Sequence, residues 1–417
     1  MEYGCIGEKL SHSFSKIIHA RLADYNYELC EIPLKGLDGF MKKADFKAIN
    51  VTIPYKQAVI PYLYYISDTA KKIGAVNTVV NKNGKLYGYN TDFSGLHALL
   101  VRQRADLKGG NVLILGSGGT SKTAAAVAED LGAKEIYRVS RSGSDGAITY
   151  DEAYKKHGDA TAIINTTPCG MYPNIGTSAI DLSRFENVKS VTDAVYNPLS
   201  SALVISARER GINATGGLYM LVSQAAYAVE KFTGVSISAD KTEEVYREIL
   251  RDKKNIVLIG MPGCGKTTLG KISADRLHKE FIDTDAEIIK RINMPISEYF
   301  AKQGEESFRR LESEVIKEIS ACRSSVIATG GGAVLNPANI RLLKENGTVI
   351  FIDRPLEKLV TTADRPLSSS RELLEKRYKE RYGLYCAAAD IKIDAVNEIE
   401  QNVKNIEEVF LNENSCN

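Results

Sequence analysis

The residues with the clearest chemical meaning form a glycine-rich stretch directly after a short apolar run. Residues 255–259 read Asn-Ile-Val-Leu-Ile, and residues 260–268 read Gly-Met-Pro-Gly-Cys-Gly-Lys-Thr-Thr, which matches the phosphate-binding pattern GxxxxGK[ST]. Glycines allow backbone amides to curl around a phosphate, and a helix that begins near Lys266 directs its positive end at the same anion. In this pattern Lys266 reaches the β- and γ-phosphates, and the Thr267 hydroxyl binds Mg²⁺. The candidate ATP-binding residues are Gly260, Gly263, Cys264, Gly265, Lys266, Thr267 and Thr268.

A second glycine loop predicts a dinucleotide site. Residues 111–115 are a continuous apolar run, typical of a buried parallel strand, and Gly116-Ser-Gly-Gly-Thr-Ser leads into an alanine-rich helical stretch. The next predicted strand, 135–139, ends in Ser-Arg141-Ser. An NAD enzyme would place a carboxylate there, whereas an arginine suits the 2′-phosphate of NADP; the alternative is a solvated surface arginine. The candidate NADP(H)-binding residues are Gly116, Ser117, Gly118, Gly119, Thr120, Ser140, Arg141 and Ser142.

Polar side chains also gather near predicted strand ends in the first hundred residues. The segments are Ser-His-Ser-Phe-Ser at 11–15, Asn-Val-Thr-Ile-Pro-Tyr-Lys at 50–56, Gly-Ala-Val-Asn-Thr at 74–78 and Gly-Tyr-Asn-Thr-Asp at 88–92. The serines could instead cap the helix that follows them, and a lone lysine or aspartate is usually solvated. Lys56 and Asp92 close strands, however, where α/β folds place their ligands.

The region after the P-loop carries further polar motifs. Asp283 and Asp285 stand two residues apart at a predicted strand end, where they could serve Mg²⁺ and a hydroxyl group. Residues 304–312 read Gly-Glu-Glu-Ser-Phe-Arg-Arg-Leu-Glu before an amphipathic stretch, and the strand 325–329 ends in a run of glycines, 330–332. The remaining motifs are Arg-Pro-Leu at 365–367 and an arginine- and tyrosine-rich helical stretch at 371–385.

The elements that must position these residues alternate short apolar runs with helical patterns, which predicts α/β architecture. A chain of 417 residues is too long for one core, so two or three domains are expected. Charged residues make up 25% and the net charge is only +2, with no long basic run, which argues against nucleic acid. The sequence has no apolar run long enough to span a membrane and no signal-peptide pattern. Its scattered cysteines predict reduced thiols and a cytoplasmic location, and its scattered histidines do not form a zinc pattern.

Together, the clusters of the first hundred residues resemble the shikimate dehydrogenase family, whose patterns are S-H-S-x-S, N-V-T-x-P-x-K, G-A-V-N-T and N-T-D. Segments at 162–171, 193–199 and 216–224 resemble later motifs of the same family, so the resemblance covers residues 1 to about 235. It implies that Lys56 and Asp92 are the catalytic pair, which fits a ketone reduction that needs a proton donor. It also implies that Gly217 and Met220 lie near the nicotinamide. The implied shikimate-binding residues are Ser13, Ser15, Thr52, Asn77, Tyr196, Gln224 and Asp92.

The motifs from residue 254 to about residue 395 resemble shikimate kinase. The shared patterns are D-x-D, G-E-x-x-F-R-x-x-E, the glycine run, the R-P-L lid and R-x-x-L-Y. The resemblance implies that Asp283 supports Mg²⁺ together with Thr267, and that Arg365 contacts the ATP phosphates. The implied shikimate-binding residues of this part are Asp285, Arg309, Gly331, Gly332 and Arg381.

These resemblances predict a bifunctional enzyme with NADP(H), ATP and Mg²⁺, small-molecule substrates, and no nucleic-acid or membrane partner. It would reduce 3-dehydroshikimate to shikimate and then phosphorylate shikimate to shikimate 3-phosphate. We expect a substrate domain at 1–100 with return helices at about 218–235, a Rossmann NADP domain at 101–217, a junction at 236–253 and a P-loop parallel α/β kinase domain, similar to nucleoside monophosphate kinases, at 254–412. The alternatives are a non-catalytic shikimate sensor at the N-terminal part, a quinate-preferring NAD enzyme, and a P-loop regulatory protein. The presence of both Lys56 and Asp92 argues against the sensor, and Arg141 argues against the NAD enzyme. The arginine and glycine motifs argue against the regulatory protein.

Overall fold

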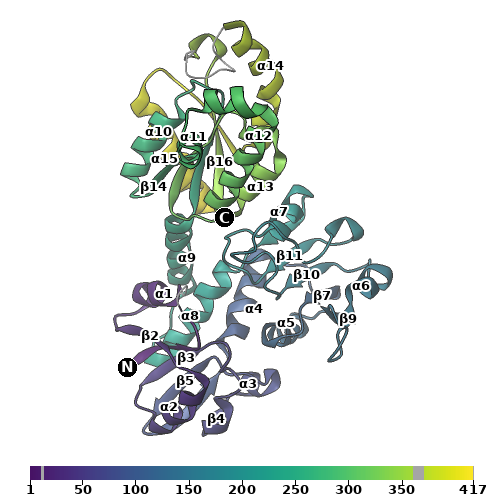
Figure 1. The fold of residues 1–417 in the computed structure, drawn as a ribbon. Helices are drawn as coiled ribbons and strands as arrows, with labels where there is room; N and C mark the ends of the chain where they lie inside the picture. The colour runs from purple at the N-terminus through teal and green to yellow at the C-terminus, as the bar shows by residue number, and fades with distance from the viewer. Residues whose placement is uncertain (11–13, 360–370, 417) are drawn as a thin grey trace. The chain divides into compact units, whose positions relative to one another are not determined.

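The computed structural model describes residues 1–10, 14–359 and 371–416 (Figure 1). The chain divides into two compact units: the first comprises 1–169, 178–196 and 206–249, and the second comprises 170–177, 197–205 and 250–417. Two short stretches of the expected Rossmann range 101–217 therefore belong to the second unit. The expected junction is helical, because α9 (Ala239–Lys253) spans most of it.

The first unit contains a mixed sheet of six strands in the order β2-β1-β3-β5-β6-β4. β1 pairs in parallel with β2 and β3, whereas β5 pairs antiparallel with both β3 and β6. β5 and β6 form a hairpin, whose turn residues Asn83 and Gly84 have φ of 54° and 81°. The strands are β1 (Tyr3–Gly7), β2 (Tyr27–Glu31), β3 (Ala48–Val51), β4 (Tyr65–Ile66), β5 (Thr78–Lys82) and β6 (Lys85–Tyr89).

Helices cover this sheet, and a late segment of the unit returns to join them. α8 (Leu218–Thr233) packs along α4 (Thr91–Gln103) and contacts α1, β3 and β5. The two helices approach closely at Gly95, where a Cβ would lie 2.6 Å from the Met220 carbonyl oxygen. The chain after the second sheet thus returns to the helices and strands of the first sheet. The other helices are α1 (Ser15–Leu22), α2 (Leu37–Lys43) and α3 (Asp68–Ile73).

The second sheet of the first unit is entirely parallel, with the order β12-β11-β10-β7-β8-β9. Read from the other edge, this is the 3-2-1-4-5-6 order of the doubly wound dinucleotide-binding fold. The central strand β7 (Asn111–Leu115) is buried from Val112 onward, as its apolar run predicts. The remaining elements are β8 (Glu135–Ser140), β9 (Ile148–Thr149), β10 (Ala162–Asn165), β11 (Ser190–Asp193), β12 (Asn213–Thr215), α5 (Gly119–Asp130), α6 (Tyr150–Lys156) and α7 (Ala202–Glu209).

The second unit has a five-stranded parallel sheet in the order β14-β15-β13-β16-β17. The fully buried strand β13 (Asn255–Ile259) lies at its centre, so the loop that follows it emerges in the middle of the carboxyl edge. Figure 1 shows α10 and α15 on one face of this sheet and α12 and α13 on the other. The strands are β14 (Glu280–Asp283), β15 (Ser325–Ala328), β16 (Gly347–Asp353) and β17 (Ile391–Asp394).

Six helices accompany the sheet in the described part of the second unit. α10 begins at Lys266, as the P-loop pattern predicts. Gly304, with φ of 77°, interrupts α12, so the motif 304–312 starts a new helical segment. The helices are α10 (Lys266–Arg276), α11 (Thr284–Ile292), α12 (Ile296–Ile319), α13 (Pro337–Asn346), α14 (Arg371–Ala388) and α15 (Ile399–Cys416). In the parts of the chain that the structure describes, no helix is long and apolar enough to cross a membrane.

Candidate active sites

Lys56 and Asp92 meet in the first unit. Lys56 lies in the turn after β3, and Asp92 lies in the first turn of α4, where Asn90 caps the helix by accepting a hydrogen bond from the Phe93 amide. The Lys56 Nζ and Asp92 Oδ2 atoms are 2.6 Å apart, and the side chains are 27% and 17% exposed. An ammonium group held against a carboxylate, and still reached by solvent, can pass a proton to a bound ligand.

A buried polar network lies beside this pair. Asn77 is 3% exposed; its Nδ2 donates to Thr91 Oγ1 at 3.1 Å, and its Oδ1 accepts from the Thr91 amide at 2.7 Å. Thr91 Oγ1 also lies 3.4 Å from Gln224 Oε1. Thr91 therefore connects two predicted shikimate-binding residues to the start of the helix that carries Asp92. The sequence motifs did not single out Thr91 for this role.

The other predicted shikimate-binding residues of this unit lie on nearby elements. Ser15 is the first residue of α1, and Phe14 precedes it. The centres of the Phe14 and Tyr196 rings lie 5.5 Å apart. Thr52 follows β3, and its amide donates to the Ile6 carbonyl at 2.9 Å. Ser13 lies outside the described residues.

The dinucleotide loop leaves room at the amino end of α5. A Cβ on Gly118 or Gly119 would meet no heavy atom within 4 Å. Gly116, with φ of 117°, is close to the neighbouring loop, because a Cβ there would lie 2.7 Å from Thr166 Oγ1. Ser117 is exposed and Thr120 is half-buried. Open backbone at a helix amino end fits a pyrophosphate group.

Arg141 is exposed just after β8, while the two serines beside it are engaged in their own turn. Ser140 Oγ accepts from the Gly143 amide at 3.1 Å, and Ser142 Oγ lies 2.8 Å from Ser144 Oγ. These serines shape the turn that presents the arginine.

Gly217 and Met220 lie at the start of α8. Gly217 is close to the neighbouring backbone, since a Cβ there would lie 2.2 Å from the Ala194 carbonyl oxygen, and Met220 is buried in α8.

The P-loop of the second unit has the backbone that phosphate binding requires. Gly260, Gly263 and Gly265 have φ of 148°, 80° and 101°, conformations that favour glycine. The buried Lys266 folds back, and its Nζ donates to the Gly260 and Met261 carbonyl oxygens at 2.8 and 3.1 Å. Two residues before Lys266, Cys264 is buried; two residues after it, Thr268 is exposed.

Thr267 and Asp283 are joined beside the P-loop. Thr267 Oγ1 donates to Asp283 Oδ2 at 2.8 Å. Among the described residues, no group of three or more His, Cys, Asp or Glu side chains could hold a metal ion. A hydroxyl and one carboxylate nevertheless fit Mg²⁺, which binds through few protein ligands and takes the rest from water and substrate phosphates.

Arg309 lies between two glutamates and against the glycine run. Its Nη1 donates to Glu312 Oε2 at 2.7 Å, and its Nη2 donates to Glu305 Oε1 at 3.1 Å. A Cβ on Gly332 would lie 1.8 Å from Arg309 Nη1, so the guanidinium lies directly against this glycine. Burial raises the pKa of the Glu312 carboxyl, and Arg309 opposes that shift. Glu312 was quoted in the sequence motif but was not singled out as a site residue.

Arg381 reaches the same glycine run from α14. Its Nη1 donates to the Gly331 carbonyl at 2.9 Å, and the Tyr385 hydroxyl donates to the same oxygen at 2.6 Å. A Cβ on Gly331 would lie 2.9 Å from the Pro262 ring, so this run packs against the P-loop.

Asp285 lies at the same glycine run: a Cβ on Gly330 would lie 2.5 Å from its Oδ1. The predicted kinase shikimate residues therefore converge beside the predicted ATP loop. Arg365 lies outside the described residues.

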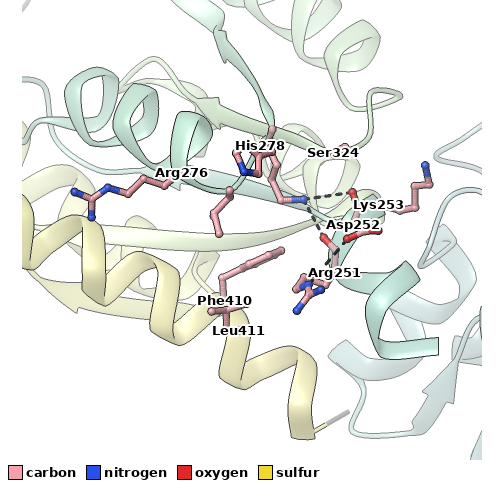
Figure 2. Close-up of a pocket in the computed structure, with 10 residues that line it drawn as sticks. Arg251, Asp252, Lys253, Arg276, His278, Ser324, Phe410 and Leu411 are labelled. Atoms are coloured by element: carbon pink, nitrogen blue, oxygen red, sulfur yellow. Dashed lines mark hydrogen bonds and ion pairs between the residues drawn. The ribbon is translucent and has the colours of Figure 1, made fainter. Parts of the chain in front are cut away.

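A separate cavity of about 510 Å³ lies at the opposite edge of this sheet (Figure 2). Its residues Lys253, Lys279 and Ser324 precede β13, β14 and β15, whereas the P-loop follows β13. Lys279 Nζ donates to the carbonyls of Arg251, Asp252 and Lys254, and Arg276 pairs with Glu400. The residues that line this cavity include none of the predicted site residues that the structure describes, so it is separate from the candidate active site.

Comparison with known proteins assigns both parts of the chain. The family model of shikimate kinase matches residues 262–410, and that of the shikimate dehydrogenase substrate binding domain matches residues 5–79. An NADP(+) shikimate dehydrogenase of Clostridium perfringens (strain ATCC 13124) is 36% identical over 271 residues, which cover 59% of this chain and 97% of that protein.

Solved structures agree with the sequence relatives. A chorismate mutase/shikimate 5-dehydrogenase fusion protein from Clostridium acetobutylicum is 38% identical, with a TM-score of 0.56 and coverage of 59% of this chain and 96% of that one. The shikimate 5-dehydrogenase of Thermus thermophilus, solved with NADP(H) and shikimate, is 28% identical, with a TM-score of 0.54 and coverage of 60% and 99%. The chain therefore belongs to the shikimate dehydrogenase family, carries a shikimate kinase domain after that region, and is a bifunctional enzyme of the shikimate pathway.

Proposed function

We propose that Lys56 and Asp92 are the catalytic pair of the dehydrogenase, which reduces 3-dehydroshikimate to shikimate. NADPH, when bound, supplies the hydride for this reduction. Lys56 donates a proton to the ketone oxygen and becomes a neutral amine, and a proton from solvent then restores its ammonium form. Asp92, 2.6 Å away, stays ionised and orients that ammonium group. Both groups are partly exposed, which allows that return of the proton.

The neighbouring polar residues bind the ring of the substrate. Ser13, Ser15, Thr52, Asn77 and Gln224 supply hydroxyl and amide groups, and Tyr196 covers the ring. Thr91 acts as a positioning residue, because it holds the Asn77 and Gln224 side chains without being needed as a ligand itself. The network that orients these amides is buried, so their preferred geometry exists before the substrate binds.

Arg141 determines the choice of NADP over NAD. Its position after the second strand of the dinucleotide fold is where the adenosine ribose is recognised, and its exposed guanidinium suits a 2′-phosphate. The pyrophosphate occupies the open backbone at Gly118 and Gly119, with Ser117 and Thr120 beside it. Gly217 and Met220 lie at the nicotinamide.

The second unit phosphorylates shikimate with ATP. Arg309 and Arg381 bind the substrate carboxylate, and Asp285 accepts a hydrogen bond from the hydroxyl that attacks the γ-phosphate. The P-loop residues hold the nucleotide. Lys266 leaves the carbonyl oxygens of Gly260 and Met261 to reach the phosphates, and Arg365 completes the phosphate site. Thr267 and Asp283 hold Mg²⁺, which neutralises phosphate charge when bound. The scattered cysteines and these metabolites support a cytoplasmic location.

The observation that carries the kinase proposal is the convergence of Arg309, Arg381 and Asp285 on a glycine run that packs against the P-loop. The test is to measure each half-reaction alone with the full chain. We expect NADPH oxidation with 3-dehydroshikimate without ATP, and ADP formation with shikimate without NADPH. Failure of the first with success of the second would favour the sensor alternative for the first unit. The contact between Lys56 and Asp92 argues against that alternative, because a sensor needs no proton donor.

A further inference from the structure

Arg354 lies beside the P-loop and belongs to none of the motifs described above. It directly follows β16, the strand that pairs with β13 from Asn255 to Ile259. A Cβ on Gly265, the last glycine of the loop, would lie 4.0 Å from Arg354 Nη1. The guanidinium is therefore adjacent to the backbone amides that this kind of loop uses to bind phosphate.

The Arg354 guanidinium lacks an anionic partner in the described part of the chain. Its Nε is buried without a hydrogen-bond partner there. The neighbouring Asp353 is already engaged, because its Oδ2 accepts from the Tyr382 hydroxyl and from Lys392 Nζ, each at 2.8 Å. Keeping a half-buried cation without an anion costs free energy, so its placement at a phosphate loop points to an anionic ligand.

We propose that Arg354 is a further nucleotide-binding residue of the kinase site and that its guanidinium binds the α- and β-phosphates of ATP. This inference rests on the proposed function of the P-loop. Loop amides of this type hold the α- and β-phosphates, while the lysine serves the β- and γ-phosphates. Because Arg354 lies beside Gly265, it contacts the phosphates that remain in ADP, and it contributes to binding both nucleotides.

Calorimetric titration of the full chain with ADP and with inorganic tripolyphosphate tests the proposal. Arg354→Gln is expected to weaken the affinity for each ligand about 10- to 100-fold, as for loss of a charge-assisted hydrogen bond, while the KM for shikimate stays unchanged. Arg354→Lys should recover part of the loss, because it retains the charge without the planar geometry. Arg310→Gln is the matched control, since Arg310 is 71% exposed and pairs with Glu306.

Two results would overturn the inference. One is ADP affinity within about twofold of the original protein in Arg354→Gln, well below the expected effect. The other is weaker ADP binding with unchanged tripolyphosphate binding, which would place the contact at the base or ribose. Should Arg354→Gln fail to fold, Arg354→Lys decides, with unchanged affinity for both ligands counting against the proposal.

Lys266→Ala separates this inference from the function on which it depends. If Lys266→Ala abolishes kinase turnover while Arg354→Gln binds ADP normally, only the role of Arg354 is wrong. If Lys266→Ala retains turnover, the P-loop assignment itself is wrong.

Discussion

Lys56 Nζ and Asp92 Oδ2 lie 2.6 Å apart although 36 residues separate them in the chain. The backbone of each residue is fixed separately. The Val76 amide donates to the Lys56 carbonyl at 2.8 Å, and Asp92 lies in the first turn of α4. The pair is thus a product of the tertiary fold and is available before any ligand binds.

Lys56→Ala is expected to lower the dehydrogenase kcat about 10²- to 10⁴-fold, because a positioned proton donor contributes that much. Steady-state NADPH oxidation with 3-dehydroshikimate measures the effect, and ADP formation with shikimate should not change. Lys47→Ala is the control, since that lysine is 60% exposed and pairs with Glu2 at the surface. A drop of less than about threefold would remove Lys56 from the proton-transfer step.

Arg141→Asp is expected to shift the kcat/KM ratio from NADPH toward NADH by about tenfold or more. The new carboxylate repels a 2′-phosphate and accepts a hydrogen bond from a 2′-hydroxyl. Kinetics with both cofactors give the ratio, and Arg141→Ala should lose NADPH preference without gaining NADH affinity. An unchanged ratio in both variants would mean that this exposed arginine points away from the ribose.

Arg309→Lys and Arg381→Lys should each reduce kcat/KM for shikimate by about 2–4 kcal/mol of transition-state stabilisation, in the range for breaking a charged contact at a desolvated site. Lysine cannot copy the bidentate geometry of a guanidinium against a carboxylate. The KM for ATP and the dehydrogenase activity should remain close to their original values. Arg310→Lys, on the exposed side of the helix that carries Arg309, is the control; an effect equal to that of Arg309→Lys would indicate a general disturbance of α12.

The stability of the first unit should depend on His19 in mildly acidic solution. Burial lowers the pKa of this fully buried imidazole from 6.5 to about 3, and its ring stacks on Tyr27 at 3.8 Å. Between these pKa values the unfolded chain binds a proton that the folded chain does not, so stability falls as pH drops below 6.5. The loss between pH 7.5 and pH 5 should be about 2 kcal/mol.

Urea unfolding followed by circular dichroism at the two pH values measures this dependence. His19→Phe preserves a ring beside Tyr27 but cannot bind a proton, so its stability should change less over the same interval. Equal pH dependence in both proteins would show that His19 is not the responsible group.

Local patterns predict the elements that carry the nucleotide loops. An apolar strand, a glycine loop and a helix are adjacent in sequence, so β13 with α10 and β7 with α5 could be identified without tertiary information. The family motifs likewise named the arginines that meet at the glycine run. Local patterns could not predict contacts between residues that are distant in the sequence. The Thr91 hydroxyl meets Asn77 and Gln224, and Arg354 meets Gly265, only in the folded structure.

Both activities are tested together when the full chain is supplied with 3-dehydroshikimate, NADPH and MgATP and the products are identified by mass spectrometry. We expect shikimate 3-phosphate, together with NADP⁺ and ADP. Lys56→Ala should form little product from 3-dehydroshikimate yet phosphorylate added shikimate, and Lys266→Ala should accumulate shikimate. If the folded original protein forms no shikimate 3-phosphate, or if both variants form it undiminished from 3-dehydroshikimate, the chain does not carry out the two reactions at these sites.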